Sequence, residues 1–248
     1  MMKIVINGAG GRMGQELVIA AKNSYKGSYL AAVADQQLPT VDDCPAYRSL
    51  DYVTEDCDVL VDFSHHSATQ SVVNFAMKRG IPAVIATTGQ TEDEKKMILQ
   101  AAKHIPIFFA GNMSIGIALL VNLVKTAVQT FPEADVEIIE THHNQKLDVP
   151  SGTALMIAQG IQQVKQQASL CIGRHENGKR PQDEVGIHSI RMGKVVGIHE
   201  IHINTGSQTI TLKHEAHSRA LFAEGALHAA EYILHKPAGL YSLQDLFE

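Results

Sequence analysis

The sequence has few of the residues that secreted, metal-binding or membrane proteins concentrate. It contains only three cysteines in 248 residues, and Cys44, Cys57 and Cys171 are scattered without a Cys-x-x-Cys pair. An odd, dispersed set predicts neither a disulfide framework nor a zinc site. No run approaches the roughly eighteen apolar residues of a membrane-spanning helix. No basic, apolar leader opens the chain, so we expect a cytoplasmic protein without membrane partners.

An excess of positive charge is also missing. The chain carries 21 Lys and Arg against 26 Asp and Glu, for a net charge of −5. Its basic runs are no longer than the pairs Lys95-Lys96 and Lys179-Arg180. A nucleic-acid partner is therefore not expected. A small anionic ligand would need a locally positive pocket, because the overall field repels it.

The length and hydrophobic content of the chain allow two domains. Hydrophobic residues make up 45% of the sequence, and 248 residues are enough to form two cores. In the first half, short apolar runs typical of buried parallel strands alternate with helical patterns. The expected strands are Lys3–Asn7, Tyr29–Ala34, Val59–Phe63, Ala83–Ala86 and Ile107–Ala110, and the expected helices are 12–22, 67–79 and 91–103. This alternation predicts an α/β domain with a Rossmann-type, doubly wound parallel sheet.

The pattern changes in the second half, where strands follow one another without helices between them. We expect a helix over 115–130, a strand over 135–140, a polar loop over 141–152, a helix over 153–167, a loop-like stretch over 171–184, strands over 187–192, 195–204 and 208–216, a helix over 221–234 and then a short tail. Consecutive strands separated by Gly-Lys and Gly-Ser turns predict a second, α+β domain with a mixed or antiparallel sheet.

A glycine-rich turn joins the first strand to the first helix. The segment is Gly8-Ala9-Gly10-Gly11-Arg12-Met13-Gly14, and its glycines follow a G-x-x-G-x-x-G spacing. Such a turn brings backbone amides close to a pyrophosphate at a helix N-terminus. Asp35 ends the second strand, where an acid binds ribose hydroxyls. A tight turn followed by an unrelated aspartate is the alternative, but the order of strand, glycines, helix and acid predicts a dinucleotide site.

The residues after Asp35 bear on which nicotinamide cofactor is used. Gln36 and Gln37 follow it in place of an arginine. An acid without an adjacent cation repels a 2′-phosphate, which favours NADH over NADPH. Arg12 offsets part of that repulsion, so we expect a preference for NADH or the use of both.

Two further turns follow the fourth and fifth strands, at the edge of the sheet where such folds bind ligands. They are Ala86-Thr87-Thr88-Gly89 and Ala110-Gly111-Asn112-Met113-Ser114. Both are rich in small residues. The pattern alone fits nicotinamide contacts and plain loops equally well.

The most unusual stretch runs from Glu140 to Thr153. Ser151-Gly152-Thr153 places hydroxyls and unpaired backbone amides at a helix start, which suits a carboxylate. His143 and Lys146 add positive charge beside it, and the imidazole of His142 suits general acid catalysis. A solvated polar loop is the alternative, yet the position of the cluster favours a site for a small anionic substrate.

Three other functions compete with that of an anion-binding reductase. The H-x-x-H pairs His199/His202 and His214/His217 suggest a metal enzyme, but residues three apart on a strand face opposite sides, so we expect no metal site. A redox sensor would bind NADH without needing the cluster around His142. A reductase of an aldehyde or keto acid stays open on the pattern alone.

The chain resembles a known family, the 4-hydroxy-tetrahydrodipicolinate reductases of the diaminopimelate route to lysine. These enzymes are also called dihydrodipicolinate reductases. The family signature H-H-x-x-K-x-D-x-P-S-G-T-A is present as His142 through Ala154. The glycine-rich opening, the Thr87-Thr88-Gly89 turn and the Asn112 loop match in the same order. The sequence departs from many relatives at Gln36, where they have arginine, and at Ala86, where they have glycine.

The resemblance implies roles for individual residues. His142 would be the proton donor and acceptor, and Lys146 a second donor. His143, Gly152 and Thr153 would bind the substrate carboxylates, with Ser151 in the same turn. The cofactor would be held by Gly8, Ala9, Gly10, Gly11, Arg12, Met13, Asp35, Ala86, Thr87, Thr88, Ala110, Gly111, Asn112 and Met113.

The resemblance also implies the reaction and the assembly. A nicotinamide nucleotide would deliver hydride to C4 of a cyclic unsaturated imine, with a proton added at C3 and water lost from the hydroxylated dicarboxylate substrate. The cofactor domain would span 1–113, with 222–248 returning to it, and 114–221 would bind substrate and form a homotetramer through joined sheets.

Overall fold

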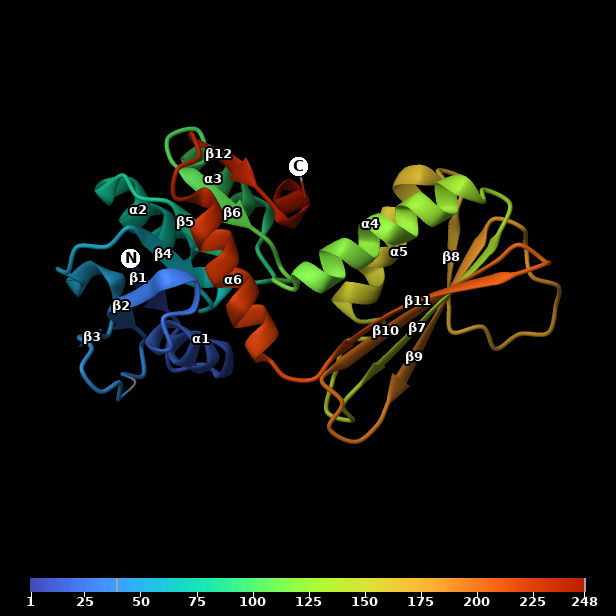
Figure 1. The fold of residues 1–248 in the computed structure, drawn as a ribbon, viewed down its shortest axis with the longest axis horizontal. Helices are drawn as coiled ribbons and strands as arrows, with labels where there is room; N and C mark the ends of the chain where they lie inside the picture. The colour runs from blue at the N-terminus through green and yellow to red at the C-terminus, as the bar shows by residue number, and fades with distance from the viewer. Residues whose placement is uncertain (39, 248) are drawn as a thin grey trace. The chain divides into compact units, whose positions relative to one another are not determined.

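The computed structural model describes residues 1–38 and 40–247. Pro39 and Glu248, which fall within the expected cofactor domain, lie outside the described residues. The chain divides into two compact units. Unit 1 combines Met1–Ser114 with the segment that begins at Arg219, and unit 2 is Ile115–Ser218 (Figure 1).

Unit 1 is built on a parallel sheet of seven strands in the order β12-β6-β5-β4-β1-β2-β3. The strands are β1 (Met2–Asn7), β2 (Ser28–Ala34), β3 (Ala46–Tyr47), β4 (Val59–Asp62), β5 (Ala83–Ile85), β6 (Pro106–Phe109) and β12 (Gly239–Tyr241). The strand order reverses at β1, which lies between β2 and β4. In open α/β sheets, ligands bind beyond the carboxyl ends of the strands at such a reversal.

Helices cover the sheet of unit 1 on both faces. They are α1 (Arg12–Lys22), α2 (Thr69–Arg79), α3 (Glu92–Ala101) and α6 (Ala220–Ile233). Helices α1 and α6 pack against each other and against the sheet, and α2 packs with α3 (Figure 1). Short 3-10 helices occupy Tyr25–Gly27, Leu50–Tyr52, His66–Ala68 and Leu243–Phe247. Burial from both sides explains the unbroken apolar runs of the strands.

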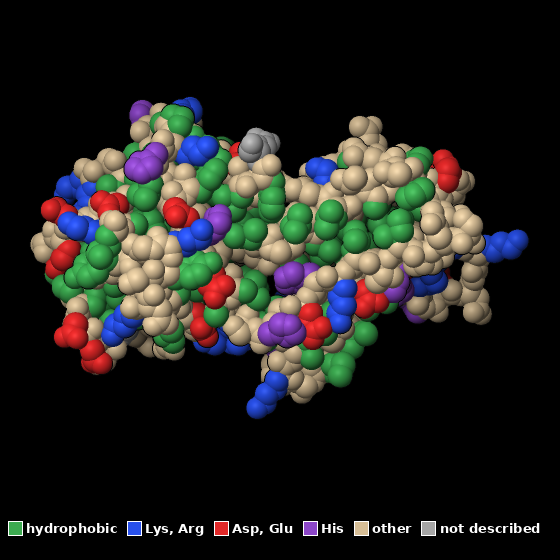
Figure 2. Space-filling view, viewed as in Figure 1, with side chains coloured by type: hydrophobic (Ala, Val, Ile, Leu, Met, Phe, Trp, Pro, Cys, Tyr) green, Lys and Arg blue, Asp and Glu red, His purple; other side chains and the backbone are tan. Residues whose placement is uncertain are grey.

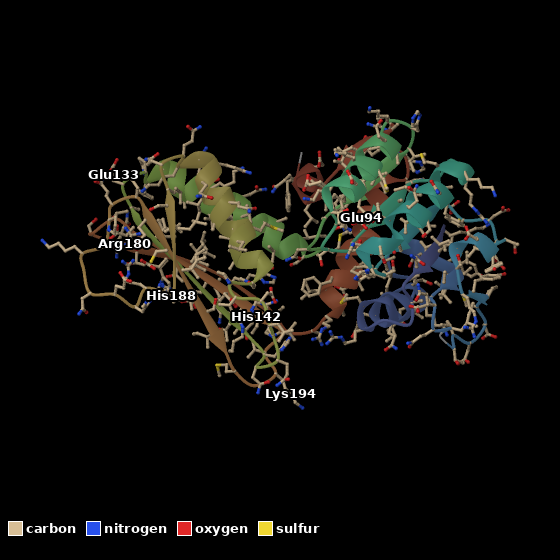
Figure 3. The ribbon with its side chains drawn as sticks, turned by 180° about the vertical axis from the view of Figure 1, so that it is seen from behind. Glu94, Glu133, His142, Arg180, His188 and Lys194 are labelled. Carbon is tan, nitrogen blue, oxygen red and sulfur yellow. The ribbon has the colours of Figure 1, made fainter. Side chains whose placement is uncertain are left out.

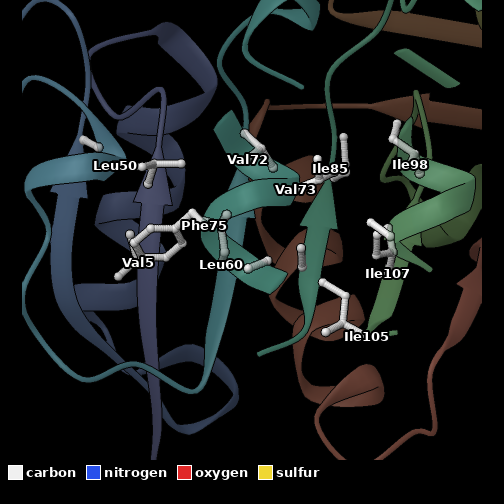
Figure 4. Close-up of a cluster of buried hydrophobic side chains, with 14 of the residues drawn as sticks. Val5, Leu50, Leu60, Val72, Val73, Phe75, Ile85, Ile98, Ile105 and Ile107 are labelled. Atoms are coloured by element: carbon white, nitrogen blue, oxygen red, sulfur yellow. The ribbon is translucent and has the colours of Figure 1, made fainter. Parts of the chain in front are cut away.

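The core beneath α2 and α3 shows how tightly the strands are held. Val5, Leu60, Ile85 and Ile107 come from four neighbouring strands and are fully buried against helix residues such as Val72 (Figure 4). Burying each such side chain contributes about 1.5–3 kcal/mol. This packing makes the sheet a rigid base for the turns at its carboxyl edge.

Unit 2 contains a mixed five-stranded sheet in the order β11-β10-β7-β9-β8. The strands are β7 (Asp135–His142), β8 (Ser169–Ile172), β9 (Glu184–Arg191), β10 (Gly197–Asn204) and β11 (Thr209–Ala216). Strand β7 pairs in parallel with β9 and antiparallel with β10. Helices α4 (Ile115–Thr130) and α5 (Gly152–Val164) pack on the sheet through residues such as Val124 and Ile157, which are fully buried.

The α/β class and the mixed second sheet are confirmed, but some local expectations were wrong. Strand β7 continues through His142 into the expected loop, because Thr141 and His142 pair with Ile190 and Arg191 of β9. Strand β8 enters the expected loop 171–184 and pairs with β9. The tail forms β12 beside β6, and β3 was not expected. These segments are too short to carry a periodic pattern. They become strands because each pairs with a neighbouring strand.

No helix in the described part of the chain is long and apolar enough to cross a membrane. On the face drawn in Figure 2, acidic and basic side chains are interspersed, and no extended patch of one charge covers that face.

Candidate functional site

The glycine-rich turn of unit 1 requires glycine for steric reasons. Gly8 has φ +84°, and a Cβ there would lie 2.6 Å from the backbone of Ser64. A Cβ at Gly14 would lie 2.1 Å from the carbonyl oxygen of Gly8. Gly11 is the N-cap of α1 and supplies no side-chain cap. The helix therefore begins with uncapped amides beside a turn that lacks side chains, which fits a pyrophosphate.

Asp35 holds this turn in place. Its two carboxylate oxygens accept hydrogen bonds from the backbone amides of Gly10 and Gln37, each at 2.9 Å. The carboxylate keeps further lone pairs, since each oxygen accepts more than one hydrogen bond. Asp35 can therefore fix the loop and still accept from a ribose hydroxyl.

A pocket of about 510 Å³ opens at the reversal point of the sheet. We call it the β1–β4 pocket, and its wall is made of Asn7, Gly8, Gly11, Asp35, Gln36, Arg48, Ser49, Leu50, Phe63, Ser64, His65, Ser67, Ala68 and Ser71. Of the expected cofactor residues, Gly8, Gly11 and Asp35 are in this wall. Ala9, Gly10, Arg12 and Met13 belong to the same turn but not to the wall.

The other expected cofactor residues form two touching turns after β5 and β6. A Cβ on Gly111 would lie 3.1 Å from the Thr88 methyl carbon. Within the first turn, Gln90 donates to the Thr87 hydroxyl at 2.5 Å, and in the second the Asn112 side chain accepts from the Ser114 amide at 2.8 Å. Ala86 and Met113 are buried, and Ala110 is partly exposed. The structure thus joins the two turns at neighbouring strand ends, outside the wall of the β1–β4 pocket.

In unit 2, a buried carboxylate organises the region around His142. Glu140 is 0% exposed, and it accepts from His142 Nδ1 at 2.6 Å, from both terminal nitrogens of Arg191 at 2.8 Å and from the Ser151 amide at 3.1 Å. Burial alone would raise the pKa of Glu140, but the hydrogen bonds from His142 and Arg191 outweigh it and hold this pKa well below its usual range. We call these four residues the Glu140 network.

The network determines which nitrogen of His142 is available. An ionised carboxylate only accepts hydrogen bonds, so Nδ1 of His142 carries a proton and donates it to Glu140. The other nitrogen, Nε2, faces Gly197 of β10, where a Cβ would lie 3.0 Å away. Glycine at this position keeps space beside the reactive nitrogen.

His199 lies against the network from β10. Its ring meets that of His142 edge to face, with centroids 5.2 Å apart. Its Nε2 is 3.2 Å from the Ser151 hydroxyl, which itself accepts from the Ala154 amide as the N-cap of α5. Burial, helped by the nearby charge of His142, lowers the pKa of His199 to about 3. His199 is therefore neutral.

Lys146 and Asp148 complete the region. Their ion pair spans 2.9 Å, and the Lys146 side chain is largely buried. Burial would raise the pKa of Asp148, but Lys146 and the Gly152 amide lower it. The Asp148 carboxylate thus contacts Lys146, an expected proton donor, and the amide of Gly152, an expected ligand of a substrate carboxylate. The backbone carbonyl of His143 accepts a hydrogen bond from the Lys146 amide at 3.1 Å. Thr153 lies in the first turn of α5. His143 and Thr153 are both partly buried.

The structure brings the expected residues His142, Lys146, Ser151 and Gly152 together, and it adds three that sequence reasoning missed. Glu140 could have been found, because it continues the alternation of buried Val136 and Ile138 along β7. Arg191 and His199 had no local signal, since separate strands supply them. Figure 3 shows His142 toward the end of the sheet where Lys194 lies, and Arg180 and Glu133 toward the other end.

The two histidines of the first H-x-x-H pair lie in different surroundings. His199 is buried, whereas His202, three residues on, is partly exposed and pairs with Glu200 at 2.7 Å. No group of three or more His, Cys, Asp or Glu side chains suited to a metal occurs within 1–38 and 40–247.

A Rossmann-type unit with a glycine turn, next in the chain to a unit with a carboxylate-held histidine, defines a pyridine-nucleotide oxidoreductase. Family models described as dihydrodipicolinate reductase N-terminus and C-terminus match residues 2–113 and 116–247. The chain belongs to the dihydrodipicolinate reductase family.

Individual relatives are similar over the full length. The 4-hydroxy-tetrahydrodipicolinate reductase of Caldanaerobacter subterraneus subsp. tengcongensis is 42% identical, covering 99% of this chain and 98% of that protein. The one from Alkaliphilus metalliredigens is 39% identical over the same shares. A solved dihydrodipicolinate reductase from Paenisporosarcina sp. TG-14, with dipicolinate bound, superposes with a TM-score of 0.84 at 28% identity and covers 99% of both chains.

Proposed function

We propose that this chain reduces 4-hydroxy-tetrahydrodipicolinate to tetrahydrodipicolinate with a reduced nicotinamide nucleotide, as the curated relatives' names indicate for them. The observation that carries the proposal is the Glu140 network. It holds a histidine with one nitrogen fixed and the other unblocked, beside a helix N-terminus and a lysine. That arrangement suits proton transfer to a bound dicarboxylate.

The proposal assigns the proton chemistry to His142 and Lys146. Glu140 holds Nδ1 of His142, so Nε2 is the atom that gives or takes a proton. When bound, the reduced nicotinamide supplies a hydride for C4 of the substrate ring, and the proton at C3 comes from the protein. Lys146 is a second donor, which Asp148 holds in place at 2.9 Å. Glu140 and Arg191 are positioning residues, because they act through His142 and Ser151.

The carboxylates of the substrate are proposed to bind at the start of α5. Ser151, Gly152 and Thr153 form this turn, with His143 beside it. A Cβ added to Gly152 would meet nothing within 4 Å, so its surroundings are open. The dipicolinate in the Paenisporosarcina reductase supports a planar dicarboxylate as ligand. Carboxylates at a helix N-terminus are stabilised by its amides and dipole.

The cofactor is proposed to bind unit 1 at the β1–β4 pocket and the adjoining turns. The glycine turn accepts the pyrophosphate, Asp35 the adenosine ribose, and the turns 86–88 and 110–113 the nicotinamide end. Because Gln36 and Gln37 follow Asp35, we propose that NADH is preferred or that both cofactors are used. Assembly into a homotetramer through the sheets of unit 2 belongs to the same proposal, and light scattering should give four times the mass of one chain.

The decisive assay generates the substrate in place from pyruvate and aspartate semialdehyde with a synthase, and follows NADH and NADPH oxidation in separate reactions. We expect oxidation that depends on this protein and on the synthase. Tight NADH binding without oxidation of either cofactor would contradict the proposed reaction and indicate a sensor or a reductase of another substrate.

A further inference from the structure

A basic residue, Arg48, follows the strand that pairs with the strand ending before Asp35. Strands β2 and β3 pair in parallel, with Ala34 opposite Tyr47, and the Asp35 amide donates to the Tyr47 carbonyl at 2.9 Å. The next residues on the two strands are Asp35 and Arg48. Neighbouring strands are about 4.8 Å apart, so the two backbones run side by side where the strands end. Both residues are in the wall of the β1–β4 pocket.

Within residues 1–38 and 40–247, Arg48 is uncommitted. It is exposed, and no hydrogen bond or ion pair engages its guanidinium among the residues that the structure describes. It is also the single lysine or arginine in the described wall of the pocket. Asp35, in contrast, is already engaged by the amides of Gly10 and Gln37. The pocket wall therefore has a fixed acid and a cation that none of the described residues engages.

We propose that Arg48 binds the 2′-phosphate of NADPH, so that the chain takes NADPH as well as NADH. The inference rests on the proposed function, because it places the adenosine ribose at Asp35. A phosphate on that ribose meets repulsion from the Asp35 carboxylate, and a guanidinium alongside offsets it. Arginine suits this task because its planar fork donates two hydrogen bonds to one phosphate.

Other groups in the wall are less suited to the phosphate. Gln36 is neutral and cannot balance its charge. The Ser49 hydroxyl is taken up in the cap of the following 3-10 helix, where it contacts the Asp51 amide at 3.2 Å and the Asp51 carboxylate at 3.1 Å. Arg48 thus supplies the cation that is missing directly after Asp35 in the sequence.

Calorimetry on the full chain tests this without turnover. NADH, NADPH and 2′,5′-ADP are titrated into the unmodified protein, Arg48→Gln and Lys78→Gln. Lys78 is an exposed cation on α2 outside the pocket wall, so its variant matches the change in charge. We expect Arg48→Gln to weaken NADPH and 2′,5′-ADP about 10- to 100-fold, as for a hydrogen-bonded charge pair, with NADH unchanged. Lys78→Gln should change none of the three, and added salt should weaken NADPH more than NADH only while Arg48 is present.

The alternative outcomes separate the inference from the proposed function. Equal NADPH affinity in Arg48→Gln and the unmodified protein overturns the role of Arg48, and so does tight NADH binding with no NADPH binding in the unmodified protein; both leave the reductase proposal standing. Failure of all three ligands to bind the unmodified protein overturns both. Because Arg48 is exposed, the variant should fold, and a thermal melt equal to that of Lys78→Gln checks this.

Discussion

The two units of this chain build their candidate sites by different means. In unit 1 the β1–β4 pocket is shaped by backbone, with Gly8 and Gly14 at positions where any Cβ would collide. In unit 2 the Glu140 network is built around a buried carboxylate that accepts hydrogen bonds from the His142 and Arg191 side chains and the Ser151 amide. The pocket of unit 1 suits a cofactor whose phosphates must come close to backbone amide donors. The network of unit 2 suits proton transfer, where preorganised charge matters more than shape.

The largest effect should come from His142, because its unblocked nitrogen is unique to the network. We expect His142→Gln to lower turnover about 10²- to 10⁴-fold, the usual contribution of a general acid, with NADH affinity unchanged. His188→Gln is the matched control, since His188 also pairs with a glutamate of β7, Glu137, at 2.8 Å but away from the network (Figure 3). Equal losses in the two variants would remove His142 from the reaction.

Lys146 tests whether the second unit has one proton donor or two. Lys146→Ala should lower turnover about 10²-fold while calorimetric NADH binding barely changes, because the lysine belongs to unit 2. Lys194→Ala, an exposed lysine after β9, is the control. Normal turnover in Lys146→Ala would leave His142 as the only proposed donor.

Glu140 tests whether the network also supports folding. Glu140→Ala leaves a guanidinium and an imidazole without their acceptor, and should lower the free energy of unfolding by about 3–5 kcal/mol, as expected for a broken buried pair. Glu137→Ala on the same strand breaks partly exposed pairs and should cost about 1 kcal/mol or less. Urea denaturation of both variants measures this difference in the free energy of unfolding. Similar losses in the two variants would mean that the burial of Glu140 does not make its interactions stronger than those of Glu137.

Two glycines separate packing from ligand contact in unit 1. Gly14→Ala must move the Gly8 backbone, so it should cost about 1–3 kcal/mol of stability and weaken NADH binding. Gly11→Ala meets only an ordinary contact at 3.4 Å but lines the pocket and replaces the glycine N-cap of α1. It should therefore weaken NADH binding with a stability loss of about 1 kcal/mol or less. A stable Gly14→Ala with full NADH affinity would show that this turn is more plastic than its geometry indicates.

The smallest effect concerns pH. His199 stays neutral in the folded protein until its pKa of about 3, whereas an unfolded histidine takes up a proton near pH 6.5. The unfolded chain then binds more protons, so stability should fall as the pH drops below about 6.5, by up to about 1.4 kcal/mol per pH unit. Denaturation between about pH 5 and 7 should show this slope in the unmodified protein and in His202→Gln, and a weaker slope in His199→Gln. An unchanged slope in His199→Gln would assign it to another group.

Elements with long periodic patterns and motifs with local chemistry can be predicted from the amino-acid sequence. The glycine turn, Asp35 and the segment from His142 to Thr153 could be found because spacing along the chain fixes how they fold. The same holds for the alternation that gives unit 1 its parallel sheet. Short strands such as β3 and β12 could not be found, because two or three residues carry no period and only pairing selects them.

The distant side chains that complete each site are set by strand pairing and packing in the folded chain. Arg191 and His199 contact the Glu140 network from β9 and β10, and Arg48 follows β3 where Asp35 follows the neighbouring β2. Cross-strand neighbours are set by register and strand order, which depend on packing of the whole sheet and leave no mark in the local sequence. The absence of an arginine directly after Asp35 therefore did not mean the absence of an arginine beside it.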